Sequence, residues 1–351
     1  MAPATLSATF RSIQRNLFPA LEEELGELCS SHRQVVATLE LLDLPSLVHY
    51  SYGESVGGRP RLGRLPFLKA FVAKAALGEG CTRSLLDRLR HDPVLRRLCG
   101  WEERHRIPSE ATFSRAFAEF AEVDLPGRIH ARLTGRHAAE RGGPARQVSY
   151  DSTDIPARES PADRDRPRPR MPRLERQAAN SLERDLLRVP VQCDFGVKTK
   201  GHGHEYCWKG YKLHLAVTDG DIPVAAVVSA ASLHDSQAVI PLMQKCRRAG
   251  LDWVCDLADS AYDAATIRHY SRSKRRIAVI DHNRRRGEKT EFLPHEKLLY
   301  KHRSCVERAF SQLKDWYGCG KIWVKGIRKV TAHLLFGLLA LSSAQIARSY
   351  G

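Results

Sequence analysis

The sequence lacks the features that mark several large classes of protein. It has no run of 18 apolar residues, which a membrane-spanning helix requires, and its N-terminal segment carries Arg11 and Arg15 where a secretion signal needs an apolar core. None of the nine cysteines forms a Cys-x-x-Cys pair, and His202, His204 and Cys207 lack a fourth metal ligand at suitable spacing. We therefore expect no membrane association, no zinc-type site and a reducing cytoplasm as the compartment.

Acidic residues are scarce compared with basic ones. The 351 residues include 56 Lys and Arg against 40 Asp and Glu, a net charge of +16. A solvated basic surface is the simplest explanation of this excess, and a polyanionic partner is the more specific one. Nucleic acid is favoured over a membrane surface, because no long basic amphipathic segment is present. With 42% hydrophobic residues the chain can bury the core of one or two folded domains.

Residues 1–143 are expected to be helical throughout. Apolar residues recur at three- and four-residue steps, and Ser109 or Thr112 can cap a short helix that carries three phenylalanines on one face (Phe113, Phe117 and Phe120). A helical bundle with a solvated basic face is one interpretation. The functional interpretation is a region for DNA binding and dimerisation.

Residues 144–351 alternate between strand and helix patterns. The expected strands are 147–155, 210–219, 222–232, 251–259 and 275–281, with a hairpin turn at Asp219-Gly220; the expected helices are 236–250, 264–273, 303–317 and 327–348. This order predicts an α/β domain, a mixed sheet flanked by helices. An insertion at about 155–205 interrupts it. Its first part, 155–188, contains nine Arg and five Pro and is expected to be an exposed or mobile loop.

Three carboxylates fall where catalysis would need them. Asp151 lies in the first strand, Asp259 ends the strand at 251–259, and Glu307 lies in the helix at 303–317. Neighbouring strand ends converge in an open sheet, and clustered carboxylates favour Mg²⁺ or Mn²⁺, which two-metal sites use to cleave phosphodiesters. Taken singly, each acid is more simply a turn former, a helix cap or a solvated side chain. Nearby Asp154, Asp256 and Asp263 stay open as alternatives.

The helix at 303–317 adds a second pattern. Tyr300, Arg303, Glu307 and Lys314 follow the spacing Y-x2-R-x3-E-x6-K, so the last three share one helical face. A surface ion pair between Arg303 and Glu307 would explain part of this spacing. A catalytic helix would instead present the carboxylate to a metal and the cations to flanking phosphates.

Together with SYDSTD, WKGYKLHLAV, SLHDS and LADSAYD, this arrangement resembles the DDE transposases of bacterial insertion sequences over roughly residues 145–345. The resemblance implies an RNase H-like domain in which Asp151, Asp259 and Glu307 are the catalytic and metal-binding acids. It also implies two Mg²⁺ ions, with Mn²⁺ as a substitute, and DNA contacts by Tyr300, Arg303 and Lys314. The implied partners are the double-stranded DNA of transposon ends and target and a second copy of the chain, in the cytoplasm at the nucleoid. Ala261 departs from the family pattern, since many relatives have Gly there.

Two basic runs flank the third acid. Residues 266–289 and 297–329 each carry nine Lys or Arg against two acids, which suggests a track for phosphates. His234 and Asp235 could assist near the site, although a helix cap by Asp235 or Ser236 is the simpler role. The expected reaction is cleavage by water, which leaves a 3′-hydroxyl that attacks target DNA or the opposite strand. A metal-dependent nuclease of the same fold, a domesticated DNA-binding relative and a plain basic structural protein are the alternatives.

Overall fold

The computed structural model describes residues 4–47, 62–163, 169–199, 205–284 and 288–350. The chain divides into two compact units. Unit 1 comprises residues 1–136, 313–321 and 331–351, and unit 2 comprises residues 137–312 and 322–330. The sequence predicted a division near residue 143; the structure groups two C-terminal segments with the N-terminal helices.

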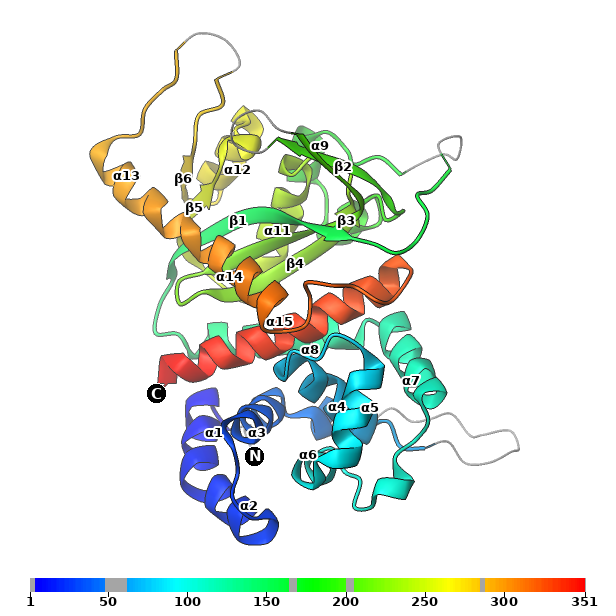
Figure 1. Cartoon of the computed structure of the whole chain (residues 1–351). Coiled ribbons are helices and arrows are strands. Elements are labelled where there is room, and N and C mark those ends of the chain that lie inside the picture. The colour runs from blue at the N-terminus through cyan, green and yellow to red at the C-terminus, as the bar shows by residue number, and fades with distance from the viewer. Residues whose placement is uncertain (1–3, 48–61, 164–168, 200–204, 285–287, 351) are drawn as a thin grey trace. The chain divides into compact units, whose positions relative to one another are not determined.

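Unit 1 is helical in its described residues (Figure 1). Its helices are α1 (Leu6–Ser12), α2 (Phe18–Leu25), α3 (Ser30–Leu42), α4 (Leu65–Ala76), α5 (Thr82–His91), α6 (Pro93–Leu98), α7 (Glu110–Glu122) and most of α8 (Leu125–Glu140). The end of α14 (Ser304–Asp315) and most of α15 (Ile327–Tyr350) also belong to this unit. The helical pattern predicted for the N-terminal region is confirmed.

Aromatic side chains form the core of unit 1. Phe113, Phe117 and Phe120 are buried on one face of α7, as predicted, and they surround Phe71 of α4. Ser109 stands at the N-cap of α7, but its hydroxyl bonds the Thr112 hydroxyl and makes no capping bond to the backbone.

Helix α15 is long and apolar enough to cross a membrane by length and composition. Its most apolar 18-residue window has a mean hydropathy of 1.6, and 83% of that window is buried inside the protein. Phe336 packs against Phe71, and Ser342 bonds His130 at 3.1 Å. These contacts are typical of a core helix.

Unit 2 is built on a six-stranded mixed sheet, which confirms the predicted α/β class (Figure 1). The strands are β1 (Ala145–Pro156), β2 (Asp194–Thr199), β3 (Glu205–Thr218), β4 (Ile222–Ala230), β5 (Trp253–Ala258) and β6 (Ile277–Ile280). They run in the order β2-β3-β1-β5-β6, with β4 also paired to β3. β1 is antiparallel to β3 and parallel to β5, and β5 is parallel to β6. The hairpin turn is confirmed, with positive φ at Gly220 and Asp221.

Helices cover both faces of this sheet. Helix α11 (Ser236–Arg248) lies behind the sheet in Figure 1, and the part of α14 in unit 2 lies in front of it. The other elements are α9 (Leu174–Ala179), α10 (Leu182–Leu186), α12 (Ala265–Ser273), α13 (Pro294–Tyr300) and the 3₁₀ turns η5 (Ser260–Tyr262) and η6 (Lys301–Arg303). The sequence did not predict α13, which precedes the third acid.

The expectation of an exposed loop over residues 155–188 is wrong for residues 174–186, and the rest of the insertion adds a strand. The insertion forms α9, α10 and β2, and β2 pairs with β3. Gln177 is completely buried because its amide donates to Pro172 O and to Gln237 Oε1, both at 2.9 Å. Tertiary hydrogen bonds therefore order a segment whose composition is typical of a loop. Residues 164–168 and 200–204, with His202 and His204, lie outside the described residues.

Candidate active site

The sheet register brings Asp151 and Asp259 to the same level. β1 and β5 are parallel, and Tyr150 pairs with Ala258 as the last pair of their ladder. Asp151 and Asp259 each follow these residues by one position. Adjacent strands lie about 4.8 Å apart, and residues at equal level on parallel strands point to the same face. Two carboxylates that are 108 residues apart in the sequence therefore lie side by side.

Asp151 is largely buried, with 19% of its side chain exposed. Its Oδ1 accepts the backbone N–H of Ser152 at 2.7 Å, and its Oδ2 accepts Arg303 Nη1 at 3.1 Å. Burial, followed by the charge of Asp259, raises the pKa of Asp151 to about 6 despite the opposing effect of Arg303. The carboxylate form is thus held at an electrostatic cost, which a nearby cation would offset.

Asp259 opens the turn η5. Its Oδ1 accepts the backbone N–H of Ala261 at 2.9 Å, so the acid caps its own turn. Burial raises the pKa of Asp259, and Asp235 adds to this rise. Ala261, where many relatives have Gly, is not among the described residues with positive φ. The backbone there accepts alanine without strain, and the alanine supplies the N–H that orients the acid.

Glu307 meets Asp151 through a shared arginine. Arg303 donates Nη1 to Asp151 and Nη2 to Glu307 Oε1. Glu307 lies in the first turn of α14 with 55% of its side chain exposed, while the Arg303 side chain is only 18% exposed. The surface ion pair considered for these two residues is therefore present, and it is joined to the buried acid Asp151.

The two other predicted DNA contacts have different surroundings. Tyr300 ends α13, and its half-buried ring packs against Phe292 at 4.7 Å between centroids, with the Arg303 guanidinium 5.7 Å from the ring centre. Burial raises the pKa of Tyr300. Lys314 lies in the last turn of α14 and belongs to unit 1, whereas Arg303 and Glu307 belong to unit 2.

Two alternative acids have structural roles. Asp256 is completely buried and accepts Tyr150 OH at 2.8 Å and Trp253 Nε1 at 2.6 Å, with Arg276 at 3.7 Å. Asp263 accepts Arg268 Nε and the backbone N–H of Asn283, both at 2.9 Å. Asp256 thus holds buried donors of Tyr150 and Trp253 in the core, and Asp263 ties Arg268 to the backbone of Asn283, so each acid has a structural role.

Sequence reasoning gave too small a role to Asp235. Its side chain makes no capping bond to α11, so the cap proposed for it is wrong; the backbone N–H of Ser236 donates to His234 Nδ1 instead. Asp235 Oδ1 accepts Lys212 Nζ at 2.9 Å. Burial alone would raise the pKa of Asp235, but the neighbouring His214 and Lys212 bring it below its ordinary value. Burial lowers the pKa of His214 to about 4, so Lys212 is the cation that pairs with Asp235 near pH 7.

Tyr262 was also missed. Its side chain is completely buried, and its hydroxyl has no hydrogen-bond partner within the described part of the chain. Burial, together with the charges of Asp151, Asp235 and Asp259, raises the pKa of Tyr262 well above its ordinary value. The neutral phenol of Tyr262 thus lies near three carboxylates, and its hydroxyl is available to donate a hydrogen bond. The sequence signal was an aromatic residue three positions after a strand-ending acid.

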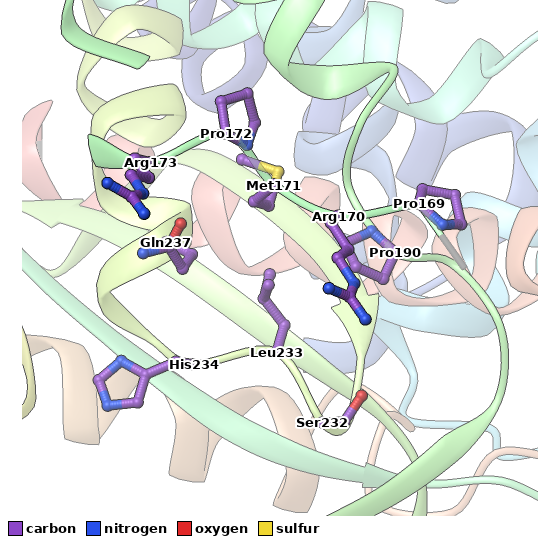
Figure 2. Close-up of a pocket in the computed structure, with 10 residues that line it drawn as sticks. All are labelled: Pro169, Arg170, Met171, Pro172, Arg173, Pro190, Ser232, Leu233, His234 and Gln237. Carbon is purple, nitrogen blue, oxygen red and sulfur yellow. The ribbon is translucent and has the colours of Figure 1, made fainter. Parts of the chain in front are cut away.

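A pocket of about 440 Å³ is lined by His234 and Gln237, which lie next to Asp235 in the sequence. Figure 2 shows the insertion residues 169–173 on one side of the pocket and Ser232, Leu233, His234 and Gln237 on the other, with Pro190 also in the lining. Arg170 and Arg173 extend from the insertion at this pocket. The Arg/Pro-rich segment therefore borders the loop that carries Asp235.

The residues of the site suit a hard divalent cation. Carboxylate oxygens are the ligands that Mg²⁺ and Mn²⁺ prefer, and the raised pKa of Asp151 and Asp259 reflects burial and repulsion that such an ion relieves. In the described ranges, no three Asp, Glu, His or Cys side chains are already grouped to hold a metal. Arg303 bonds both Asp151 and Glu307 in the structure, so this guanidinium would have to release them for joint coordination.

Comparison with known families identifies the chain. A family model described as a transposase DDE domain matches residues 142–342, and a model described as a transposase domain matches residues 23–119. Searches of curated proteins and of solved structures found no significant match. The first model covers more than half of the chain and includes the paired acids, Tyr262 and the helix of Glu307. The chain therefore belongs to the DDE transposase family.

Proposed function

We propose that this transposase cleaves DNA at the ends of an insertion sequence and joins the freed ends to target DNA, with Asp151, Asp259 and Glu307 as its catalytic acids. Divalent metal ions are general in the family, and the proposal specifies two Mg²⁺ ions, with Mn²⁺ as a substitute, held by these acids. When bound, such ions supply Lewis-acid stabilisation of the charge that develops on the phosphate oxygens.

The observation that carries the proposal is the pairing of Asp151, inside β1, with Asp259, which directly follows the end of the neighbouring strand β5. Burial and repulsion raise the pKa of Asp151 to about 6, which is unfavourable unless the acids bind a cation. A protein that only bound DNA would gain nothing from buried carboxylates facing phosphates. The retained acids therefore favour an enzyme over the domesticated DNA-binding relative.

The reaction proceeds in two displacements at phosphorus. Water attacks a phosphodiester at the element end, breaks the P–O3′ bond and leaves a 3′-hydroxyl and a 5′-phosphate. The 3′-hydroxyl then attacks a target phosphodiester, forming a new P–O bond and displacing the target's own 3′-oxygen.

We assign DNA contacts to Arg303, Tyr300 and Lys314. On this proposal, Arg303 exchanges its carboxylate partners for a DNA phosphate when an end binds, which frees Asp151 and Glu307. Tyr300 presents the exposed part of its ring to the DNA, and Lys314 holds a flanking phosphate. The helices of residues 1–143 bind DNA and a second copy of the chain, so that a homodimer holds two element ends at the nucleoid.

A nicking assay on duplexes that carry the element's own ends tests the proposal. With Mg²⁺ or Mn²⁺, the wild type should nick the ends, and Glu307→Gln should bind them with similar affinity without nicking. Glu291→Gln is the matched control, because it removes an exposed carboxylate that pairs with Lys297 at 3.7 Å. Metal-dependent nicking by Glu307→Gln would remove Glu307 from the site. Tight binding by the wild type without nicking in either metal would favour the DNA-binding relative.

A further inference from the structure

The basic run at 266–289 is divided by the fold. Lys274 and Arg275 lie between α12 and β6, at the beginning of that strand, whereas Asp259 follows the end of the parallel neighbour β5. Six residues of β5 at about 3.3 Å each separate the two edges by roughly 20 Å. This part of the run therefore lies at the opposite edge of the sheet from the acids and cannot surround them.

A pocket of about 630 Å³ opens at that opposite edge. Three cations line it, Arg247 from the last turn of α11 and Lys274 and Arg275 from the end of α12. All three are exposed, and no ion pair joins any of them to a carboxylate among the described residues. We call this the edge pocket.

The helix-end carbonyls and the one carboxylate at the edge pocket accept hydrogen bonds from backbone N–H groups. Helix C-termini carry partial negative charge on free carbonyls, which would explain basic residues there without any ligand. Here, however, Leu251 N–H bonds Cys246 O at 3.2 Å and Arg276 N–H bonds Ser271 O at 3.0 Å, closing the last turns of α11 and α12. Asp252, the acid of the pocket, accepts the backbone N–H of Trp253 at 3.1 Å. Asp252 can offset only one of the three cations, so the lining of the edge pocket keeps a net positive charge.

Arg275 provides an independent observation. It holds a left-handed backbone, with φ of 59°, at the position after α12 where the corresponding turn after α11 has Gly250, with φ of 79°. Left-handed backbone favours Gly and is tolerated by Asn and Asp. The other described non-glycine residues with positive φ are all aspartates (Asp43, Asp124 and Asp221). An arginine kept in a strained position, at a pocket with two further cations, points to a function of its side chain.

We propose that the edge pocket binds the phosphodiester backbone of duplex DNA through Arg247, Lys274 and Arg275. The separation of roughly 20 Å from the acids corresponds to about six base pairs, so these phosphates lie outside the cleaved step. The inference rests on the proposed function only in taking DNA as the ligand. It assigns a second DNA contact that requires no metal and no cleavage.

Fluorescence anisotropy of the full-length protein with a labelled 40-base-pair duplex, at 50–200 mM salt in EDTA, tests this site. Replacing all three cations with Gln should make the plot of log K, the association constant, against log salt concentration shallower by about 2.7, because each phosphate contact contributes roughly 0.9 to the steepness. The wild type should thus lose about 40-fold more affinity across this range than the triple variant. Arg247→Gln alone should lower the slope by about 0.9. Arg248→Gln is the matched control, because Arg248 has the same charge on the same helical turn but pairs with Glu183 outside the pocket.

Arg275→Gly separates binding from folding. It should raise the unfolding midpoint by about 2–4 °C, since glycine relieves the strained backbone, and still lower the salt slope by about 0.9. An unchanged slope in the triple variant, with normal wild-type binding, would refute the edge pocket and leave the proposed function intact. Failure of the wild type to bind duplex DNA would refute both. Loss of stability without loss of DNA affinity would show that the cations serve the helix ends only.

Discussion

Replacing Asp151 with Asn should make this transposase more stable at pH 8 while abolishing cleavage. The pKa of Asp151 is raised to about 6 in the folded protein, against 3.8 for the ordinary group. The folded state therefore binds the proton more tightly than the unfolded state does. The contribution of Asp151 to stability is therefore most favourable below pH 3.8, becomes less favourable as the pH rises toward 6, and stays unfavourable above that value.

The size of the effect follows from the shift. A difference of about two pKa units corresponds to roughly 3 kcal/mol, at 1.36 kcal/mol per unit. The side chain is only 19% exposed, so solvent screens little of this energy. Asn removes the charge in both states, so the variant should gain about 2–3 kcal/mol at pH 8, or about 4–12 °C in Tm, and almost nothing at pH 4.

Thermal unfolding followed by circular dichroism in EDTA, at pH 4 and pH 8, measures this difference. Asp219→Asn is the contrasting control. Burial would raise the pKa of Asp219, but hydrogen bonds from Thr218 and Arg141 bring it below its ordinary value. Its neutralisation should therefore destabilise the protein at pH 8. An Asp151→Asn variant that is less stable than the wild type at pH 8 would refute the electrostatic reasoning.

Three further predictions concern the surroundings of the acids. Arg303→Ala should raise the pKa of Asp151 further in the metal-free protein, because its cationic partner is lost, and should move the pH range over which Asp151 lowers stability upward in EDTA. Arg303→Lys should restore part of this shift, and an unchanged pH dependence of the Tm would contradict the pairing of Arg303 with Asp151. Lys212→Met should lower the free energy of unfolding, measured in urea, by about 1–3 kcal/mol, because Asp235 loses its cationic partner. Adding Asp235→Asn should recover part of this loss, and full stability of Lys212→Met would contradict the pairing. Tyr262→Phe should leave the Tm unchanged or raise it, because it removes a buried hydroxyl that has no partner in the described structure. The same variant should cleave DNA more slowly. A large drop in Tm would mean that the hydroxyl is hydrogen-bonded.

Asp151 and Asp259 could be placed on the sheet from the sequence because apolar runs of recognisable period mark their strands. Asp259 ends a buried strand, and Asp151 lies within another, so strand prediction alone put both on a sheet. Their pairing needed the register of β1 against β5, which no local pattern contains. Helical spacing placed Glu307 and Arg303 on one face of a helix, but the bond from Arg303 to Asp151 joins residues 152 apart and needs the fold.

The residues that were missed owe their roles to tertiary contacts. Lys212 and His214 alternate with apolar residues in β3 and read as solvent-facing positions. In the structure, Lys212 reaches Asp235 and His214 bonds Ser229 at 2.8 Å in the neighbouring strand. The sequence of β2 resembles that of a loop, and its apolar residues Phe195 and Val197 are exposed. Its pairing with β3 makes it a strand.

The basic run at 266–289 illustrates the same limit. Charges that are consecutive in sequence were expected to gather around the acids. Strand β6 instead carries the chain from one edge of the sheet toward the other, so Lys274 and Arg275 lie far from Asp259. Sequence clustering predicts a charged surface, whereas strand direction decides where the charge is presented.

A strand-transfer assay with pre-cut element ends and a supercoiled target tests whether the three acids catalyse the joining of DNA. Ends with a 3′-hydroxyl should join the target in Mg²⁺ with the wild type, and matched ends with a 3′-deoxy terminus should not. Asp151→Asn, Asp259→Asn and Glu307→Gln should each abolish joining while the edge-pocket control Arg248→Gln retains it. Joining by any of the three acid variants, or none by the wild type with a free 3′-hydroxyl, would contradict the account.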